Sequence, residues 1–132
     1  MNINALNIPT ELKYSKTHEW VRLLDGGRAQ VGISDYAQQA MGDIVFVNLP
    51  EEGDEVEAGA AFADCESVKA VEDIRSPFSA AVLAVNEELL DAPELLNSDP
   101  YGAWLIEVGD ISDELELMDA AAYHAFCESE AH

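Results

Sequence analysis

Short runs of alternating apolar and polar residues, separated by glycine and proline, fill most of the chain. A period of two is typical of half-buried strands. The expected strands are 18–24, 28–34, 43–50, 60–67, 70–76, 79–86 and 103–108, with a further short strand inside 51–60. Between the first two, "DGG" supplies the positive φ angles of a tight hairpin turn. The pattern therefore predicts a mainly β protein, built as a small barrel or sandwich.

A short helix is expected near 34–41, in the segment "SDYAQQAMG". Ser34 is a plausible N-cap, and Ala37, Ala40 and Met41 give the segment one apolar face. Gly42 is expected to end this helix, because glycine readily takes the left-handed backbone of a helix end.

A longer helix is predicted at the C-terminus, over 112–129. Asp113 and Glu116 have the spacing of a capping pair at its start. Between the last two predicted strands, 87–102 is rich in proline and glycine and leaves room for one helical turn.

Length and composition limit the classes of protein that fit. The chain has 132 residues, which suits a single domain over 1–132, and 48 % of them are apolar, enough for a real core. Its 27 acidic and six basic residues give a net charge of −21, which argues against nucleic acid and anionic membranes as partners. The negative charge favours partner proteins that present a basic docking face. With no basic leader and no long apolar run, we expect a cytoplasmic, bacterial protein.

No pattern of catalytic residues stands out. The chain has no glycine-rich phosphate loop and no supported nucleophile–histidine pair, and its carboxylates are too numerous for any two to stand out as acid and base. His18 is interpreted as a half-exposed strand histidine, and Cys65 as a small half-buried strand residue. The sequence therefore predicts neither a catalytic residue nor a metal site.

Lys69 is the one lysine that follows Arg28, and it lies between the predicted strands 60–67 and 70–76. The residues around it are small or acidic, so its amine is expected to project freely and to stay charged. A lysine that is displayed but not activated suits a handle that another enzyme modifies. From composition alone, a simple solvated surface charge remains the alternative.

The chain resembles a known family, the H proteins of the glycine cleavage system, which carry a lipoyl group. The segments that carry the resemblance are "LKYSKTHEWVR" (12–22), "VGISDYAQQAMGDIVFVNLPEEGDEV" (31–56), "ESVKAVEDIRSP" (66–77), "VNEELLDAPELLNSDPYGAW" (85–104) and "LMDAAAY" (117–123). "ESVKA" together with "PELLNSDPYG" is highly specific. The chain departs from the family at Ala63 and Ala80, where the family usually has glycine.

The resemblance implies a barrel–sandwich hybrid with lipoate joined by an amide bond to Lys69. Such a carrier is not an enzyme. It would take the aminomethyl group of glycine from a pyridoxal-phosphate glycine decarboxylase to a folate-dependent aminomethyltransferase, and electrons to dihydrolipoamide dehydrogenase. A lipoate ligase or octanoyl transferase would attach the cofactor, and the carrier would be a monomer. Thr17, Glu19 and Asp73 align with the cleft that shields the loaded arm.

Two other readings stay open beside this one. An acidic interaction domain could have kept the fold and lost the cofactor, although the intact "ESVKA" counts against it. A biotin carrier would require different residues around its lysine.

Overall fold

Nine strands in two antiparallel sheets form the body of the protein in the computed structural model, which describes residues 2–130. The strands are β1 (Lys13–Tyr14), β2 (Glu19–Leu24), β3 (Arg28–Ile33), β4 (Ile44–Asn48), β5 (Glu55–Val56), β6 (Ala61–Ser67), β7 (Val71–Arg75), β8 (Phe78–Val85) and β9 (Ile106–Glu114). The helices are the 3-10 helix η1 (Ile3–Ala5) and α1 (Asp35–Met41), α2 (Glu88–Asp91), α3 (Leu95–Ser98) and α4 (Ala120–Glu130). The ends of the predicted domain, residue 1 and residues 131–132, lie outside the described part.

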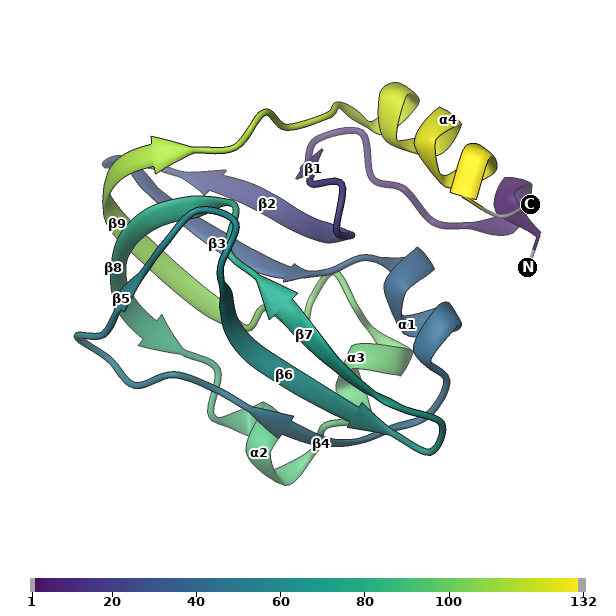
Figure 1. The fold of residues 1–132 in the computed structure, drawn as a ribbon, viewed down its shortest axis with the longest axis horizontal. Helices are drawn as coiled ribbons and strands as arrows, with labels where there is room; N and C mark the ends of the chain where they lie inside the picture. Colours follow the sequence, from purple (N-terminus) through teal and green to yellow (C-terminus); the bar gives the residue numbers. More distant parts are fainter. Residues whose placement is uncertain (1, 131–132) are drawn as a thin grey trace.

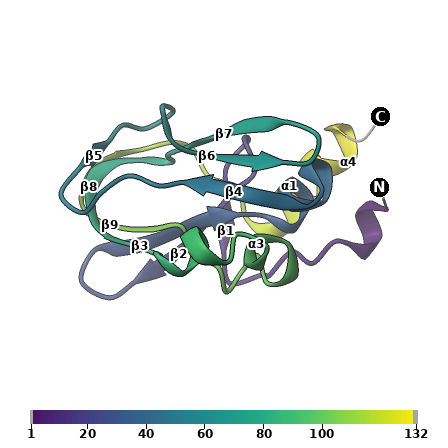
Figure 2. The same cartoon turned by 90° about the horizontal axis from the view of Figure 1, so that it is seen from below.

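The larger sheet has the strand order β1-β2-β3-β9-β8-β5, and the smaller has the order β4-β6-β7 (Figure 1). Figure 2 shows the two sheets as layers, with β4, β6 and β7 lying over the larger sheet. The predicted mainly β architecture, with a short helix and a C-terminal helix, is confirmed. The loop-rich segment holds two short helices, α2 and α3, where one helical turn was expected.

Local sequence signals explain the elements that were predicted best. In the β2–β3 hairpin, Gly26 and Gly27 take φ angles of 77° and 71°, and Leu24 pairs with Arg28. Ser34 caps α1 by accepting a hydrogen bond from the backbone N–H of Ala37 at 3.2 Å. Gly42 ends α1 with a φ of 79°, as the sequence predicts.

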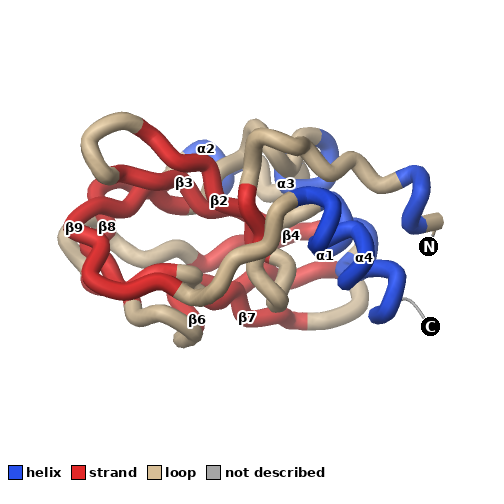
Figure 3. Tube along the Cα trace, turned by 90° about the horizontal axis from the view of Figure 1, so that it is seen from above, coloured by secondary structure: helices blue, strands red, loops and turns tan. Residues whose placement is uncertain are grey.

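Three apolar clusters form the core. The first contains residues from both sheets and includes Val47, Cys65, Ile74, Leu96 and Leu105. The second is built from the larger sheet and includes Val31, Phe78, Val82, Ile106 and Val108, with Phe62 of the smaller sheet packed against it. The third joins the larger sheet to α4 through Leu12, Tyr14, Trp20, Tyr123 and Cys127. The rings of Tyr14 and Tyr123 stack there with their centroids 4.4 Å apart. Figure 3 shows α1 and α4 at the same end of the molecule, which fixes one wall of the site described below.

The predicted C-terminal helix begins later than expected, at Ala120. Residues 112–114 belong to β9, where Asp113 pairs with Ser79, so Asp113 and Glu116 do not cap a helix. Asp119 takes that role, since its side chain accepts the backbone N–H of Ala122 at 2.9 Å. The last predicted strand, 103–108, is likewise displaced and runs from Ile106 to Glu114. Long-range strand pairing has overridden the local capping pattern.

The two alanines at usual glycine positions lie in strands, Ala63 in β6 and Ala80 in β8. Among the described non-glycine residues, only His18 and Asp110 have a positive φ angle. Neither alanine is therefore strained. No helix within residues 2–130 is long and apolar enough to span a membrane.

Gly32 on β3 lies against the indole ring of Trp20, which is fully buried. A Cβ atom at residue 32 would overlap that ring. We therefore expect Gly32→Ala to lower the free energy of unfolding by about 1–3 kcal/mol, because the ring or the backbone must shift. Urea denaturation followed by tryptophan fluorescence measures this loss. Leu23→Ala, at a side chain that is 67 % exposed on β2, is the control and should stay within about 0.5 kcal/mol of the wild type.

Candidate functional site

Lys69 lies at the tip of the β6–β7 hairpin, defined as residues 68–70. The turn is held by its own hydrogen bonds. The backbone N–H of Ser67 donates to the carbonyl of Ala70 at 2.8 Å, and the N–H groups of Lys69 and Ala70 both donate to the hydroxyl of Ser67 at 3.2 Å. The hairpin predicted around Lys69 is therefore present, with the lysine exposed at its end.

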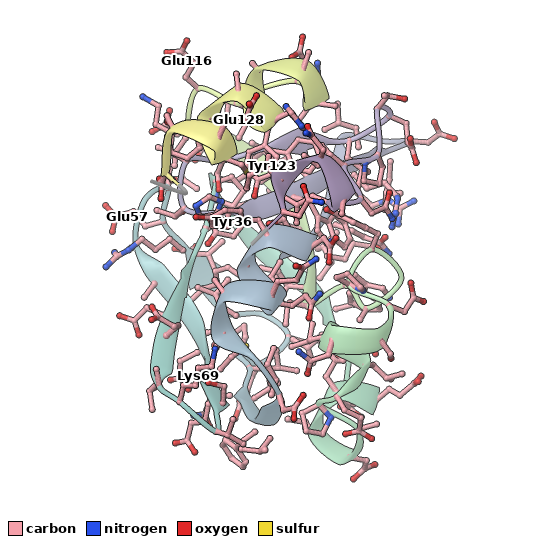
Figure 4. All side chains as sticks on the ribbon, turned by 90° about the vertical axis from the view of Figure 1, so that its right-hand side faces the viewer. Tyr36, Glu57, Lys69, Glu116, Tyr123 and Glu128 are labelled. Carbon is pink, nitrogen blue, oxygen red and sulfur yellow. The ribbon has the colours of Figure 1, made fainter. Side chains whose placement is uncertain are left out.

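The side chain of Lys69 lies beside the C-terminal end of α1 (Figure 4). A Cβ atom at Gly42 would be 3.3 Å from its Cε and 3.7 Å from its Nζ. None of the ion pairs among residues 2–130 involves this amine. Its neighbours are not only small or acidic, because Val68 and Val71 expose 69 % and 62 % of their surface. The hairpin tip thus exposes two valines beside the lysine, and within the described residues no carboxylate is paired with the amine.

A cleft of about 320 Å³ lies between α1, β7 and the segment that leads into β2. It brings together Thr17, Glu19 and Asp73, the three residues that the sequence suggested for an arm-shielding cleft. A more open hollow of about 510 Å³ shares Thr17 and Asp73 with it and adds Val71, two residues from Lys69. The remaining residues around the cleft are His18, Ile33, Tyr36, Ala37, Ala40, Met41, Glu72, Ile74 and Glu130.

Glu19 is the buried carboxylate of this cleft and exposes only 2 % of its surface. One oxygen accepts hydrogen bonds from the hydroxyls of Ser15, at 2.6 Å, and of Thr17. The other accepts the backbone N–H of Arg75 at 3.3 Å. The guanidinium of Arg75 turns away and donates to the carbonyl of Gly59 at 3.1 Å. Glu19 is therefore held rigidly by neutral donors.

The charge of Glu19 is not matched by a cation, since no ion pair within the described residues includes it. Burial raises the pKa of this carboxyl, and the hydrogen bonds from Ser15, Thr17 and the Arg75 backbone only partly oppose the rise. A buried carboxylate without a positive partner is costly, so a cation that binds beside it is stabilised. The cleft is therefore suited to a ligand that brings its own cation.

His18 forms a further wall; it is partly buried, as the sequence suggested, but it lies in the turn before β2 rather than in the strand. It lies just before β2 with a φ of 72°, and its ring stacks on Tyr36 with centroids 4.3 Å apart. Its Nδ1 lies 2.7 Å from the hydroxyl of Tyr123, and its Nε2 lies 3.5 Å from Glu130. Burial lowers the pKa of His18, against the opposing effect of Glu130.

The cleft and Lys69 are joined through α1. Ala37, Ala40 and Met41 form its apolar wall, and the next residue, Gly42, lies under the stem of Lys69. The acidic residues Glu19 and Asp73 lie on other walls of the same cleft. A flexible chain attached to the lysine could thus lie on apolar surface and place a cationic end among carboxylates.

Sequence reasoning missed several residues of the cleft. The sequence places Tyr36 and Met41 in the short helix without assigning either to a site, and Glu72 is one of several acidic residues near Lys69. Glu130, on the last turn of α4, also lines the cleft, where it lies next to His18. The two residues are more than one hundred positions apart, so no local sequence pattern identifies Glu130 as part of the site. His18 belongs to the segment "KTHEW", but no sequence pattern indicates its positive φ angle.

Cys65, on β6 below the hairpin tip, is fully buried in the first core cluster. Burial raises the pKa of its thiol to about 12. The sequence correctly placed it in a strand, although it is more deeply buried than expected.

Two antiparallel sheets packed as layers, with a lysine displayed at a hairpin tip, define the lipoyl-carrier class of barrel–sandwich hybrids, which confirms the predicted fold class. The chain belongs to the glycine cleavage H-protein family, which matches residues 12–130. Membership of this family implies a lipoyl carrier of the glycine cleavage system.

Individual relatives agree with this assignment. The chain is 55 % identical over 128 residues to the glycine cleavage system H protein of Klebsiella pneumoniae, covering 94 % of this chain and 98 % of that protein. It is 50 % identical over 125 residues to the H protein of Lachnoclostridium phytofermentans, covering 95 % and 98 %. A crystal structure of the H protein from Mycobacterium marinum superimposes with a TM-score of 0.84 at 35 % identity, over 95 % of this chain and all of that chain.

The unmatched charge of Glu19 gives a stability prediction for the carrier without cargo. Because the folded-state pKa of Glu19 is raised, its contribution to stability is present at acidic pH and is lost as pH rises through that pKa. We expect Glu19→Gln to be more stable than the wild type at pH 8, with a gap that narrows toward pH 4. Chemical denaturation at several pH values measures this gap. Asp73→Asn removes the same formal charge from an exposed residue, so a similar pH-dependent gap in that variant would contradict the explanation.

Proposed function

We propose that this chain shuttles the aminomethyl group of glycine from glycine decarboxylase to the aminomethyltransferase, and passes electrons to dihydrolipoamide dehydrogenase. In this proposal, residues 1–132 form one carrier domain without catalytic residues, and lipoate is attached covalently at Lys69. The observation that carries the proposal is an exposed Lys69 beside Gly42, the residue that follows the cleft residue Met41, together with the buried Glu19 in that cleft. Neither Lys69 nor Glu19 takes part in an ion pair within residues 2–130.

The residues present fit a lipoyl group. Nζ of Lys69 is accessible for amide formation, in which it attacks the activated acyl carbon, the activating group leaves and the nitrogen loses a proton. When attached, the group supplies a dithiolane whose sulfur can accept the aminomethyl group and whose dithiol can later be reoxidised. The apolar side of the cleft, with Ile33, Met41 and Ile74, suits the hydrocarbon part of such an arm.

Glu19 and Asp73 would serve the cargo rather than the attachment. The primary amine of an aminomethyl group is a cation at neutral pH, and a carboxylate beside it forms a charge-assisted hydrogen bond. Glu19 is ready for this role, because Ser15 and Thr17 already fix its orientation. Asp73 is exposed on the edge strand β7, so its pairing with the amine would be more screened by water.

A net charge of −21 suits enzymes that present basic docking faces, and it supports a monomeric carrier that repels its own copies. A lipoate ligase or an octanoyl transferase would modify Lys69. The relatives from Klebsiella pneumoniae and Lachnoclostridium phytofermentans support placing this carrier in the bacterial cytoplasm with these enzymes.

Lys69→Arg tests the attachment. We expect this variant to gain no mass when it is incubated with a lipoate–protein ligase, lipoate and ATP, whereas the wild type gains one lipoyl group. The fold should be unaffected, because an exposed residue at a hairpin tip contributes within about 0.5 kcal/mol. Intact-mass spectrometry gives the answer directly.

Lys16→Arg is the matched control, since Lys16 borders the open hollow but is not at the hairpin tip. It should be lipoylated like the wild type. A lipoyl increment on the Lys69 variant, or none on the wild type, would reject the assignment. A biotin increment on co-expression with a biotin ligase would instead support the biotin-carrier reading.

Glu19→Gln and Asp73→Asn test the protection of the cargo. A partly buried charge pair of this kind is worth about 1–3 kcal/mol, so removing the charge of Glu19 should speed loss of the aminomethyl group to water by about tenfold. The smaller effect is expected for Asp73→Asn, because that carboxylate is exposed. The experiment loads the carrier, removes the decarboxylase and follows the release of ammonia and formaldehyde.

Both variants should still be lipoylated at the wild-type rate, which separates cargo protection from attachment. Release at the wild-type rate from both loaded variants would show that these carboxylates do not protect the arm. Lys69 could then remain the attachment site, but the cleft would need another role.

A further inference from the structure

Asn97, from the specific motif "PELLNSDPYG", has a side chain that is fully engaged in hydrogen bonds. Its Oδ1 accepts the backbone N–H of Ile44 at 2.9 Å. Its Nδ2 donates to the carbonyl of Gly42 at 2.9 Å and to Oε1 of Gln38 at 3.0 Å. One amide on α3 therefore holds both sides of the joint between α1 and β4, defined as residues 42–44. This joint lies more than fifty residues away from Asn97 in sequence.

The residue between the two clamped positions, Asp43, holds the lysine hairpin. Its carbonyl accepts the backbone N–H of Val68 at 3.1 Å. Within the described chain, this is the one hydrogen bond that leads from the tip residues 68–70 to another part of the protein; the other bonds of the tip stay inside the turn. The joint clamped by Asn97 is thus the support on which the tip rests.

The same joint also supports the side chain of Lys69. Gly42 has a φ of 79°, and its missing Cβ leaves the space beside Cε of Lys69. If Gly42 rotated, the surface beneath the lysine stem would change together with the carbonyl that Asn97 holds. Both the backbone of the tip and the direction of the stem therefore depend on residues that one side chain fixes.

We propose that Asn97 is a positioning residue for the acylation of Lys69. It sets the orientation in which the amine meets the active site of the enzyme that attaches lipoate. This inference rests on the proposed function, in which Lys69 is the attachment site. A loosely held tip would spend less of its time in the geometry that amide formation requires, so attachment would slow although the amine stays exposed.

Asn97→Asp gives the sharpest test. It keeps the shape and the acceptor for Ile44, but replaces the Nδ2 donor by an oxygen that faces the carbonyl oxygen of Gly42. We expect kcat/KM for lipoylation, measured by intact mass with a lipoate–protein ligase, lipoate and ATP, to fall about tenfold. Asn97→Ser, which cannot span the joint and adds no charge, should show a similar loss.

Two controls separate positioning from general stability. Val21→Ala lies in the second core cluster, away from the hairpin tip, and should lower the free energy of unfolding while leaving the lipoylation rate within about twofold. Gln38→Ala removes the third partner of Asn97 but keeps the bonds to Gly42 and Ile44, so it should also stay within about twofold. All rates are compared well below the unfolding temperature, where each variant is native.

Amide hydrogen exchange provides a second readout that does not depend on lipoate. The N–H of Val68 should be protected in the wild type and should exchange about tenfold faster in Asn97→Asp, while the amides within the β6–β7 ladder stay unchanged. An unprotected Val68 amide in the wild type would overturn the proposal even if neither variant of Asn97 folds.

The outcomes distinguish this inference from the proposed function. A wild-type protein that gains no lipoyl group, or a Lys69→Arg variant that does, would reject the function itself. A wild type that is lipoylated normally, together with folded Asn97 variants that are modified at the wild-type rate, would leave the function in place and reject the role of Asn97.

Discussion

A chain with 27 acidic and six basic residues can fold only if almost every carboxylate stays in water. The antiparallel sheets meet this constraint, because alternation along each strand sends one set of side chains inward and the other outward. Within residues 2–130, Glu19 is the one charged residue whose whole surface is nearly lost from solvent. Every other carboxylate among these residues stays at least partly exposed.

The exception at Glu19 gives the cleft its character. Three neutral donors hold the carboxylate, and the guanidinium of Arg75 donates elsewhere, so the negative charge is left available. Lys69 shows the opposite arrangement, since within residues 2–130 its amine pairs with no carboxylate although acidic residues surround it in sequence. The fold thus keeps the two charges apart: Glu19 lies in the cleft beside α1, and Lys69 lies next to Gly42 at the C-terminal end of the same helix.

Much of this arrangement could be predicted from local sequence. The β2–β3 turn, the Ser34 cap, the Gly42 stop and the hairpin around Lys69 each depend on a few neighbouring residues. The start of the C-terminal helix could not, because pairing between β9 and β8 competes with the capping pattern near Asp113. The family resemblance brought Thr17, Glu19 and Asp73 to one cleft, as the structure does. It did not reveal the hydrogen bonds of Asn97 to Ile44 and Gly42, because they join segments far apart in sequence.

The burial of both cysteines has a consequence for a protein that would carry a dithiol. Cys65 lies in the strand that leads to Lys69, yet its thiol is enclosed by the core and has a pKa of about 12, so almost none of it is thiolate at neutral pH. Cys127 is equally enclosed, and burial raises its pKa as well. Thiol–disulfide exchange requires an accessible thiolate. Neither cysteine is therefore placed to exchange with the disulfide of a lipoyl arm attached at Lys69.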